Sequence, residues 1–308
     1  MKNTAISTFQ LFKMFPGQES ARIYIEKLRW PTGPVCPFCQ EVKRIYTMKK
    51  DGIYRCNACL NEFTVRTETI FGRSHIELHK WLYAMYLLVT ARKGISSMQL
   101  SKEIGVTQKT AWFMLGRIRE ACGNDISKLS GTIEIDETYI GGKEKNKHED
   151  KKVSGRGTVG KVPVIGMRER GGSTKAFPID VADVNTVYNA VTDNVEIKSF
   201  LNTDEHSGYD RLDGLFYSRQ SVNHSEKEYV RGDVHTNGIE SVWAVLKRGL
   251  NGVYHHASKK HLSRYVNEFT FRLNDGNVKR TSMERLASLL MASIGNRLTW
   301  NNLVEVKK

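Results

Sequence analysis

The stretch Thr132-Ile133-Glu134-Ile135-Asp136-Glu137-Thr138-Tyr139-Ile140 decides the fold of this 308-residue chain. Its residues alternate with a period of two, which is the pattern of a β-strand with two different faces. Ile133 and Ile135 face one side of the predicted strand, and Glu134 and Asp136 face the other. An acidic residue on a strand is usually only solvated, so Asp136 needs partners elsewhere in the chain to become a functional candidate.

The segments that follow predict a sheet around this strand. Residues 162–168 and 174–180 are predicted to be strands, residues 185–195 a helix, and residues 197–204 a fourth strand that ends in Asp204. Strand, strand, strand, helix, strand is the order of an RNase H-like mixed sheet, in which the first and fourth strands are neighbours. The pattern therefore predicts an α/β domain over residues 130–275 that brings Asp136 and Asp204 together.

A helix predicted over residues 237–249 supplies a third acidic residue. Glu240, Trp243 and Lys247 share one face of this helix, because they are spaced by three and seven residues. Three carboxylates in a partly dry cleft repel one another, and Mg²⁺ or Mn²⁺ bound by their oxygens relieves that repulsion. The alternative is an exposed amphipathic helix that simply carries charges.

Two cysteine pairs lie far upstream, Cys36-Pro37-Phe38-Cys39 and Cys56-Asn57-Ala58-Cys59. Each pair puts two thiolates on one tight turn, and two such turns can surround a zinc ion tetrahedrally. Short alternating segments lie between and after the pairs, so residues 31–70 are predicted to form a zinc ribbon. The alternative is a redox-active dithiol, for which a single pair would be enough.

Residues 74–123 are predicted to be helical and to contain a helix-turn-helix. A short helix ends at Gly105-Val106, and Thr107 is placed to cap the helix that follows. In such a unit the second helix enters the major groove of DNA. The alternative is an ordinary helical hairpin between two domains. The residues of this helix predicted to bind DNA are Gln108, Lys109, Thr110 and Arg117.

The composition agrees with a nucleic-acid partner. Lysine and arginine outnumber aspartate and glutamate by 47 to 33, which gives a net charge of +14 and favours a polyanion. At roughly 100–200 residues per domain, the length predicts two or three domains. The longest apolar run, residues 81–91, is too short to cross a bilayer, and residues 1–17 lack the pattern of a signal peptide. These features predict a soluble, intracellular protein.

The order of these motifs resembles bacterial insertion-sequence transposases of the DDE class, in the group with an N-terminal zinc ribbon. The resemblance covers most of the chain. It is carried by the ribbon and helix-turn-helix followed by Glu134-Ile135-Asp136-Glu137-Thr138-Tyr139-Ile140-Gly141-Gly142, Thr203-Asp204-Glu205-His206 and His235-Thr236-Asn237-Gly238-Ile239-Glu240-Ser241-Val242-Trp243 with Lys247.

This resemblance implies specific roles for the acidic residues. Asp136, Asp204 and Glu240 would hold the catalytic Mg²⁺ or Mn²⁺, and Lys247 would be the accompanying basic residue that contacts DNA, with Arg248 beside it. Some members of this group have Asn or His in place of the third acid, so Asn237 and His235 are the secondary candidates for the third ligand. The cofactors would be structural Zn²⁺ and the catalytic ions. The partner would be double-stranded DNA at the element ends and the target, bound by a homodimer or larger synaptic assembly in the bacterial cytoplasm, associated with the nucleoid.

Two other functions stay open at this point, a domesticated and inert DNA-binding regulator, and a metal-dependent nuclease without strand transfer. Three flanking segments are also expected. Residues 1–30 form an N-terminal helical segment. Residues 143–161 form a mobile basic loop, either a solvated insertion or a segment that orders on DNA. Residues 276–308 form a C-terminal helical segment that serves as core or as a dimer surface.

Overall fold

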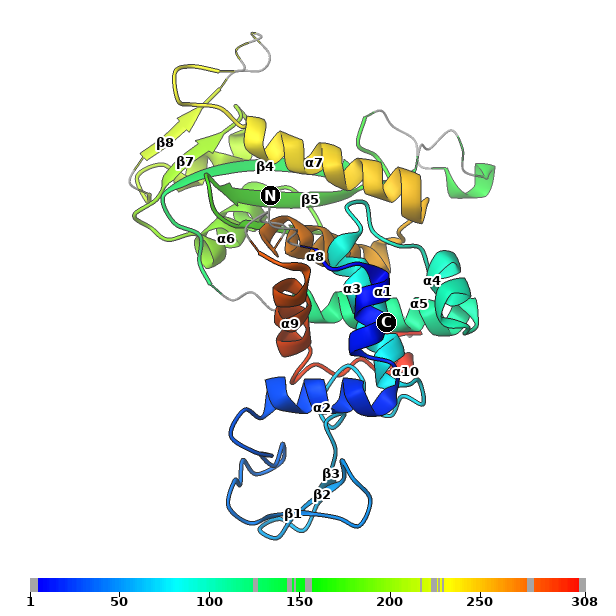
Figure 1. Cartoon of the computed structure of the whole chain (residues 1–308). Coiled ribbons are helices and arrows are strands. Elements are labelled where there is room, and N and C mark those ends of the chain that lie inside the picture. The colour runs from blue at the N-terminus through cyan, green and yellow to red at the C-terminus, as the bar shows by residue number, and fades with distance from the viewer. Residues whose placement is uncertain are drawn as a thin grey trace. The chain divides into compact units, whose positions relative to one another are not determined.

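The computed structural model describes residues 5–123, 127–142, 146, 148–152, 157–216, 218–222, 226, 228, 230–275 and 280–304. The chain divides into two compact units, whose elements are labelled in Figure 1. Unit 1 combines Met1–Asn124 with Asp275–Lys308, and unit 2 is Asp125–Asn274. Part of the basic loop expected over residues 143–161, namely residues 143–145, 147 and 153–156, lies outside the described residues.

A small antiparallel sheet forms the ribbon of unit 1. Its strands, in spatial order, are β1 (Ile45–Thr47), β2 (Tyr54–Cys56) and β3 (Glu62–Phe63). Trp30, which follows helix α2, packs edge-on against the rings of Tyr54 and Phe63. The Tyr54 hydroxyl also donates a hydrogen bond to Glu26 of α2 at 3.1 Å. The ribbon therefore shares an aromatic cluster with the N-terminal helical segment.

Helices make up the rest of unit 1. They are α1 (Thr8–Met14), α2 (Gln18–Arg29), α3 (Leu78–Thr90), α4 (Ser97–Ile104), α5 (Gln108–Ala121), α9 (Ser282–Ala292) and α10 (Trp300–Val304). The hydroxyls of Ser96 and Thr107 cap α4 and α5 by accepting backbone N–H bonds. Gly105 ends α4 with a left-handed φ of 66°, which a glycine adopts without steric cost. The helix-turn-helix expected from the sequence is present.

The C-terminal segment folds with the N-terminal half of the chain. Helix α9 packs against α2 and α3, and Thr69 forms an isolated antiparallel bridge with Ile294. The indole of Trp300 packs against Trp112 and Phe113 of α5. Residues 276–308 were expected to be a helical segment that serves as core or as a dimer surface, and the structure places the described part of them in the packing of unit 1.

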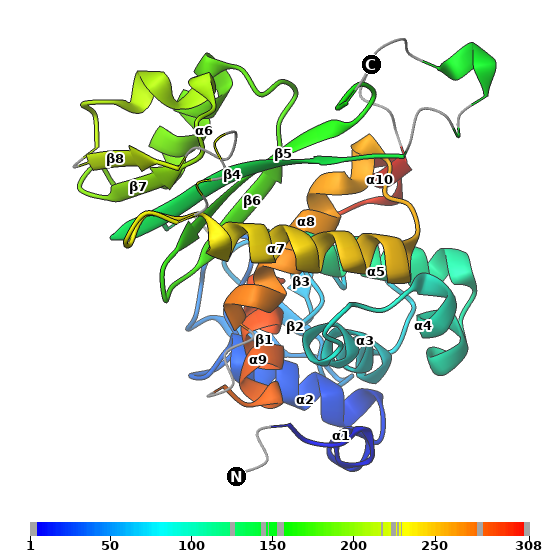
Figure 2. The ribbon, with the colours of Figure 1, turned by 90° about the horizontal axis from the view of Figure 1, so that it is seen from above.

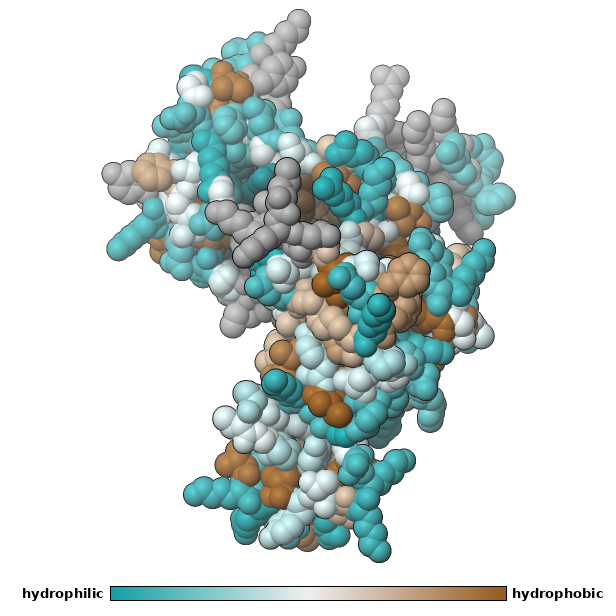
Figure 3. Space-filling view, in the orientation of Figure 1, coloured by the Kyte–Doolittle hydropathy of each residue, from teal (hydrophilic) through white to brown (hydrophobic). Residues whose placement is uncertain are grey.

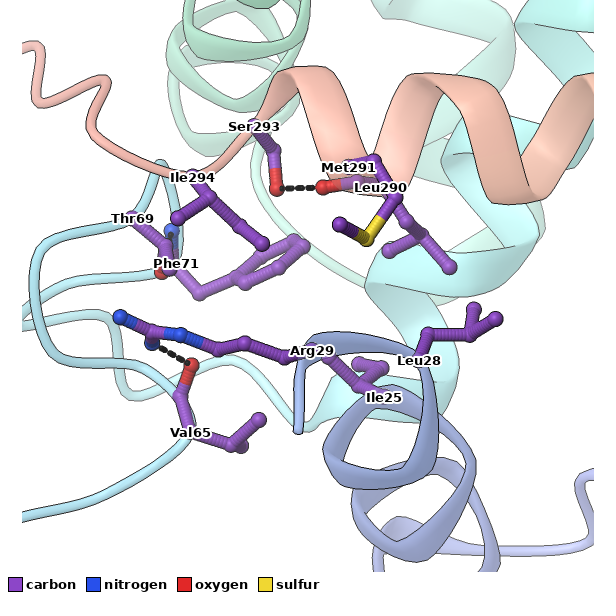
Figure 4. A pocket seen from close by; sticks show the side chains of 10 residues that line it. All are labelled: Ile25, Leu28, Arg29, Val65, Thr69, Phe71, Leu290, Met291, Ser293 and Ile294. Atoms are coloured by element: carbon purple, nitrogen blue, oxygen red, sulfur yellow. Dashed lines mark hydrogen bonds between the residues drawn. The ribbon is translucent and has the colours of Figure 1, made fainter. Parts of the chain in front are cut away.

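Figure 4 shows a small pocket inside unit 1, between α2 and the end of α9. Arg29 borders it and donates to the backbone oxygens of Val65 at 2.9 Å and Thr67 at 2.8 Å. Burial lowers the pKa of Arg29 to about 10. Because its guanidinium is occupied by these carbonyls and the pocket is mainly apolar, the feature belongs to the packing of the unit.

Unit 2 is built on a five-stranded mixed sheet in the order β6-β5-β4-β7-β8. The strands are β4 (Thr132–Ile140), β5 (Val162–Glu169), β6 (Thr174–Pro178), β7 (Phe200–Thr203) and β8 (Ser218–Ser221). Strand β4 is central, antiparallel to β5 and parallel to β7. The first and fourth strands are therefore neighbours, as the sequence predicts, and the RNase H-like mixed-sheet fold class is confirmed.

Helices cover both faces of this sheet, as Figure 2 shows for α6 and α7. The helical elements are α6 (Val184–Asn194), α7 (Asn237–Gly249), α8 (Lys259–Asp275), the short 3₁₀ helices η2 (Glu149–Lys151) and η3 (Ser207–Leu212), and the π-helical turn η5 (Leu250–Tyr254). One core contains Ile133 and Ile135 and lies under α6 and η3. The other contains Val164 and lies under α7 and α8. Glu134 and Asp136 are on the side that faces α7.

Candidate active site

Asp136 is held at the middle of β4 by two hydrogen bonds. The indole Nε1 of Trp243 donates to its Oδ2 at 2.9 Å, and the backbone N–H of Glu137 donates to its Oδ1 at 2.8 Å. Gly166 of β5 lies opposite Asp136 in the sheet, and a Cβ on this glycine would overlap the Trp243 ring. The absence of a side chain at Gly166 thus gives the indole room to reach the carboxylate.

Asp204 comes directly after β7, beside Asp136. The parallel register pairs Glu134 with Asn202, so the next inward-facing positions along the two strands are Asp136 and Asp204. The backbone N–H of His206 donates to Asp204 Oδ1 at 3.0 Å. The strand order and register therefore bring together two acidic residues that lie far apart in the sequence.

Glu240 lies in the first turn of α7 and is exposed. Its Oε1 accepts a hydrogen bond from the Thr236 hydroxyl at 3.1 Å. Glu240 shares a helix face with Trp243, and Trp243 reaches Asp136, so Glu240 is directed toward the same site. The charge of Glu240 contributes to raising the pKa of Asp136, which shows that the two carboxylates interact electrostatically.

The electrostatics of the site reflect burial and mutual repulsion. Burial raises the pKa of Asp136 to about 6, and the charge of Asp204 adds to this shift. Burial also raises the pKa of Glu137 to about 7, again with contributions from Asp204 and Asp136, while the Tyr209 hydroxyl opposes the shift. Concentrated negative charge in a poorly solvated site suits hard divalent cations with oxygen ligands.

Glu137 lies beside the acidic cluster and was not among the candidates predicted from the sequence. It points to the opposite face of β4 from Asp136, toward the fully buried Tyr209 of η3. Among the described residues, no hydrogen bond of normal geometry reaches Glu137 Oε1. Its sequence signal is the adjacent acidic pair Asp136-Glu137, but alternation along a strand sends neighbours to opposite faces. The structure nevertheless keeps both carboxylates within electrostatic reach of Asp204.

Glu134 connects β4 to the start of α7. It is 2% exposed, and its Oε2 accepts the backbone N–H of Ile239 at 3.0 Å. Its Oε1 accepts from Arg170 Nε at 2.9 Å and lies 3.3 Å from His235 Nδ1. The N-cap residue of α7, Thr236, makes no side-chain capping bond of its own. Glu134 therefore caps α7 from the neighbouring strand.

The two secondary candidates for the third ligand occupy other positions. His235 faces Glu134, as the 3.3 Å distance between Nδ1 and Oε1 shows. Asn237 is exposed and is the first residue of α7, directly after the N-cap residue Thr236. The charge of Glu240 adds to the raised pKa of Asp136. Glu240 stays the predicted third ligand, because a carboxylate binds a divalent cation better than an amide.

The four cysteines of the ribbon form a separate cluster that fits zinc. Their Sγ atoms all lie within 4.8 Å of one another, with Cys36–Cys59 and Cys39–Cys56 separations of 3.6 Å. Ligands about 2.3 Å from a tetrahedral zinc ion are about 3.8 Å apart, whereas disulfide sulfurs are about 2.0 Å apart. Gln40 and Leu60, each directly after the second cysteine of a pair, have φ values of 61° and 63°. The two turns thus have matching shapes.

The predicted DNA-binding residues of α5 differ in accessibility. Gln108 and Lys109 are exposed, and Thr110 is half-buried beside the capping hydroxyl of Thr107. Lys109 Nζ lies 4.7 Å from the centre of the Trp300 ring. Arg117 is buried and donates to the carbonyl oxygens of Leu298, Ile70 and Gly72. Arg117 therefore binds the protein's own backbone, and its side chain is not available to contact DNA as the sequence analysis predicted.

Two exposed cations lie near the end of α7. Lys247 and Arg248, in the last turn of α7, are both exposed. Figure 3 shows hydrophilic side chains over much of the visible face, with hydrophobic ones in separate patches. None of the helices in the described part of the chain is long and apolar enough to span a membrane.

Two family models match the chain. The ISXO2-like transposase domain matches residues 128–274, and the transposase zinc-ribbon domain matches residues 16–62. A Halobacterium salinarum protein named for the transposable element ISH50 is 31% identical over 273 residues, which cover 84% of this chain and 92% of the relative. A transposase-like protein of Haemophilus influenzae is 29% identical over 110 residues, which cover 34% of this chain and 85% of the relative.

Solved structures are more distant. A simian T-cell lymphotropic virus intasome in complex with PP2A regulatory subunit B56 gamma matches with a TM-score of 0.29 and 12% identity, covering 68% of this chain and 70% of that chain. The Mos1 strand transfer complex matches with a TM-score of 0.24 and 13% identity, covering 68% of this chain and 77% of that chain. Similarity this low does not define a fold, so the fold assignment rests on strand order and register.

Proposed function

The chain belongs to the ISXO2-like transposases that carry an N-terminal zinc ribbon, and we propose that it binds the ends of its own insertion sequence, cuts the DNA there and joins the freed 3′-hydroxyl ends to target DNA. Unit 2 carries the chemistry, with Asp136, Asp204 and Glu240 as ligands of the catalytic metal. Unit 1 carries recognition through the zinc ribbon and the start of α5. The proposal accounts for both halves of the chain.

The observation that carries the proposal is that three carboxylates meet at the middle of β4: the strand register puts Asp204 beside Asp136, and Trp243 links the helix face of Glu240 to Asp136. Burial and the charges of Asp204 and Glu240 act together to raise the pKa of Asp136, although the three residues come from two strands and a helix. An accidental acidic residue on a solvated strand would not be desolvated and surrounded by like charges. Such a cluster is typical of a functional site, because folding without a counter-charge leaves it repulsive.

The donor set fits a divalent cation of the Mg²⁺ or Mn²⁺ type, since every proposed ligand is a carboxylate oxygen. Bound there, the ions would activate a water molecule or a 3′-hydroxyl for attack at phosphorus and stabilise the leaving oxygen. The zinc site is chemically different, because four thiolates suit a structural zinc ion with no open position. The two metals are therefore assigned to different units.

The chain's own residues prepare the site for this reaction. Trp243 and the Glu137 backbone N–H leave Asp136 little freedom to rotate, since they engage both of its oxygens. Glu134 fixes the start of α7, and with it the helix turn that carries Glu240. Lys247 and Arg248 are exposed cations at the other end of α7, where they would contact DNA phosphates. Positioning of this kind lowers the reorganisation needed at reaction.

Recognition of DNA is assigned to unit 1 and to the overall charge. The net charge of +14 favours a phosphate backbone, and the exposed Gln108 and Lys109 at the start of α5 are placed as in a recognition helix. Thr110 would play a lesser part, because it is half-buried. Two element ends must be held at once, so the active species would be a homodimer or larger assembly on DNA, which mass photometry of the end complex tests.

The decisive experiment offers the purified protein a labelled duplex of the element's terminal repeat, a supercoiled target plasmid and Mg²⁺. The wild-type protein is expected to cut the duplex and to give a joined product. Asp136→Asn and Glu240→Gln are expected to abolish cutting while end binding persists. Asp193→Asn, at an exposed position of α6, is the matched control and should cut normally.

Each unexpected result has a defined meaning. Cutting without a joined product would favour a nuclease and would contradict strand transfer. End binding by the wild-type protein without any cutting would favour an inert DNA-binding regulator. Near-normal cutting by Glu240→Gln would move the third ligand to Asn237 or His235.

A further inference from the structure

A second polar site lies next to the acidic cluster in unit 2. This site, the end-of-strand pocket, lies between the last residues of β4 with Gly141 and Gly142, and the end of α7 with η5. Trp243 connects α7 to Asp136, and Lys247, one turn further along the same helix face, lines the pocket. The pocket therefore adjoins the acidic site along both elements that form it.

The polar groups of the pocket are donors suited to an anion. Lys247, Asn251, His255 and His256 line it, and all four residues are exposed. No acidic residue lies among the described residues that line it, although several carboxylates lie further back along β4. A volume of about 240 Å³ is below the range of about 300–1,000 Å³ for pockets that hold drug-sized ligands. The space suits a single anionic group of a larger molecule.

The backbone around the pocket is also unusual. At Gly142 a Cβ would meet no atom of the described residues within 4 Å, so the bare backbone leaves space for a ligand to approach closely. On the opposite wall, η5 is a π-helical turn, and His255 ends it with φ 59° and ψ −37°. This combination is costly for a residue with a side chain, and such strain is usually retained where it serves function.

From the donors, the lack of acids and the position, we propose that the end-of-strand pocket binds one phosphodiester group of the DNA strand that enters the acidic site, a few nucleotides from the bond that is cut. Lys247 supplies the charge, and Asn251, His255 and His256 supply hydrogen bonds to the phosphate oxygens. Tyr139, at the end of β4, lines the same pocket and offers a ring beside the adjoining sugar or base. The inference rests on the proposed function, since it places DNA at the acidic site.

The test asks whether removal of the two histidines reduces the loss of DNA affinity that follows when one phosphate is made neutral. We call such a reduction phosphate coupling. Full-length protein is bound to end duplexes that extend on both sides of the cutting position, in Ca²⁺ to prevent cutting, and affinity is read by fluorescence anisotropy. Each duplex carries one neutral methylphosphonate, moved phosphate by phosphate. The variant is His255→Gly with His256→Ala, because glycine keeps the left-handed backbone while the imidazole is removed.

At one position, the neutral linkage is expected to weaken binding by the wild-type protein about tenfold, as for the loss of a charge-assisted hydrogen bond. The same change should weaken binding by the histidine variant clearly less, because only Lys247 and Asn251 remain to contact this phosphate. Lys198→Ala is the control, because this exposed lysine precedes β7 at the opposite end of the parallel pair β4–β7 and should keep the wild-type pattern.

Equal methylphosphonate penalties in the wild-type protein and the histidine variant at every position would overturn the pocket's role. Cutting of the unmodified duplex in Mg²⁺ is measured separately and reports on the proposed function. Phosphate coupling without cutting would support the phosphate-binding role of the pocket and contradict the transposase chemistry. Cutting without phosphate coupling would support the transposase chemistry and contradict the role of the pocket.

Discussion

Replacement of Glu134 by alanine tests how unit 2 assembles its acidic site. Glu134 is 2% exposed and accepts hydrogen bonds from Ile239 N at 3.0 Å and Arg170 Nε at 2.9 Å. The substitution removes the cap of α7 and the carboxylate partner of Arg170 in one step. Arg170 keeps its bonds to the backbone oxygens of Asp233 and His235, so it loses only part of its contacts.

The expected loss of stability follows from these contacts. Breaking a buried ion pair by removing one partner costs about 3–5 kcal/mol, and the low end applies here because the Arg170 side chain is 28% exposed. A loss of about 3 kcal/mol lowers the melting temperature of a domain of this size by about 6–12 °C. Glu134→Gln keeps an acceptor for Ile239 N, so its loss should be smaller.

Thermal unfolding followed by circular dichroism measures the loss of stability. Cutting of end DNA, assayed well below the melting temperature, measures the effect on activity. Because α7 carries Glu240 and Trp243, Glu134→Ala should lower kcat for cutting while affinity for end DNA stays unchanged. Glu196→Ala, at an exposed position of the same unit, is the control. A melting temperature equal to that of the wild-type protein, or a loss confined to DNA affinity, would refute the capping role.

Three further outcomes are expected. Gly166→Ala puts a methyl group into the space of the Trp243 ring, so it should cost about 1–3 kcal/mol of unfolding free energy and reduce cutting more than DNA binding; normal cutting would contradict the link between Trp243 and Asp136. Asp136 and Glu137 have pKa values raised to about 6 and 7, so the protonated form is favoured on folding. Their contribution to the free energy of unfolding is present below about pH 4 and is lost as pH rises to about 7. For Asp136 alone it is on the order of 3 kcal/mol. Without Mg²⁺ or Mn²⁺ the melting temperature should therefore fall over this range more than in Asp136→Asn, and added Mn²⁺ should restore it at pH 7.5; equal pH profiles for the two proteins would count against the shift. Cys59→Ser should lose bound zinc, measured by atomic absorption, and destabilise unit 1 while unit 2 unfolds as before; full zinc retention would exclude the four-cysteine site.

Much of unit 2 follows from local patterns in the sequence. The alternation over residues 132–140 corresponds to β4, and the order of strands and helix predicts the parallel β4–β7 pair that brings Asp136 beside Asp204. These inferences succeed because period and element order are encoded locally. The cysteine spacing predicts the ribbon for a similar reason, since four thiolates on two turns have one common arrangement around a metal.

Features that depend on long-range packing were not predictable in this way. The sequence shows Arg117 as a cation on the predicted recognition helix, yet its three acceptors lie at Ile70, Gly72 and Leu298, far from it along the chain. Strand β8 has the sequence Ser218-Arg219-Gln220-Ser221, with no apolar alternation to indicate a strand. It forms because the exposed edge of β7 offers backbone partners.

Two contacts between β4 and α7 align the strand with the helix, Glu134 with Ile239 and Asp136 with Trp243. From Glu134 to Asp136 the strand advances about 6.7 Å. Between their partners, Ile239 and Trp243, the helix advances about 6.0 Å. The two advances are similar, so the strand and the helix can make both contacts without a bend in either. About one helical turn separates the two contacts on α7. Glu240 is the acidic residue within that turn.

A one-residue insertion in this turn would rotate Trp243 by about 100° away from Asp136, even though Glu134 could still cap the helix. His235 precedes the capped turn and faces Glu134, so it lies outside the span that the two contacts align. Asn237 opens the helix before Ile239 and lies outside that span too. The same two contacts that orient Asp136 therefore favour Glu240 over both alternatives as the third ligand.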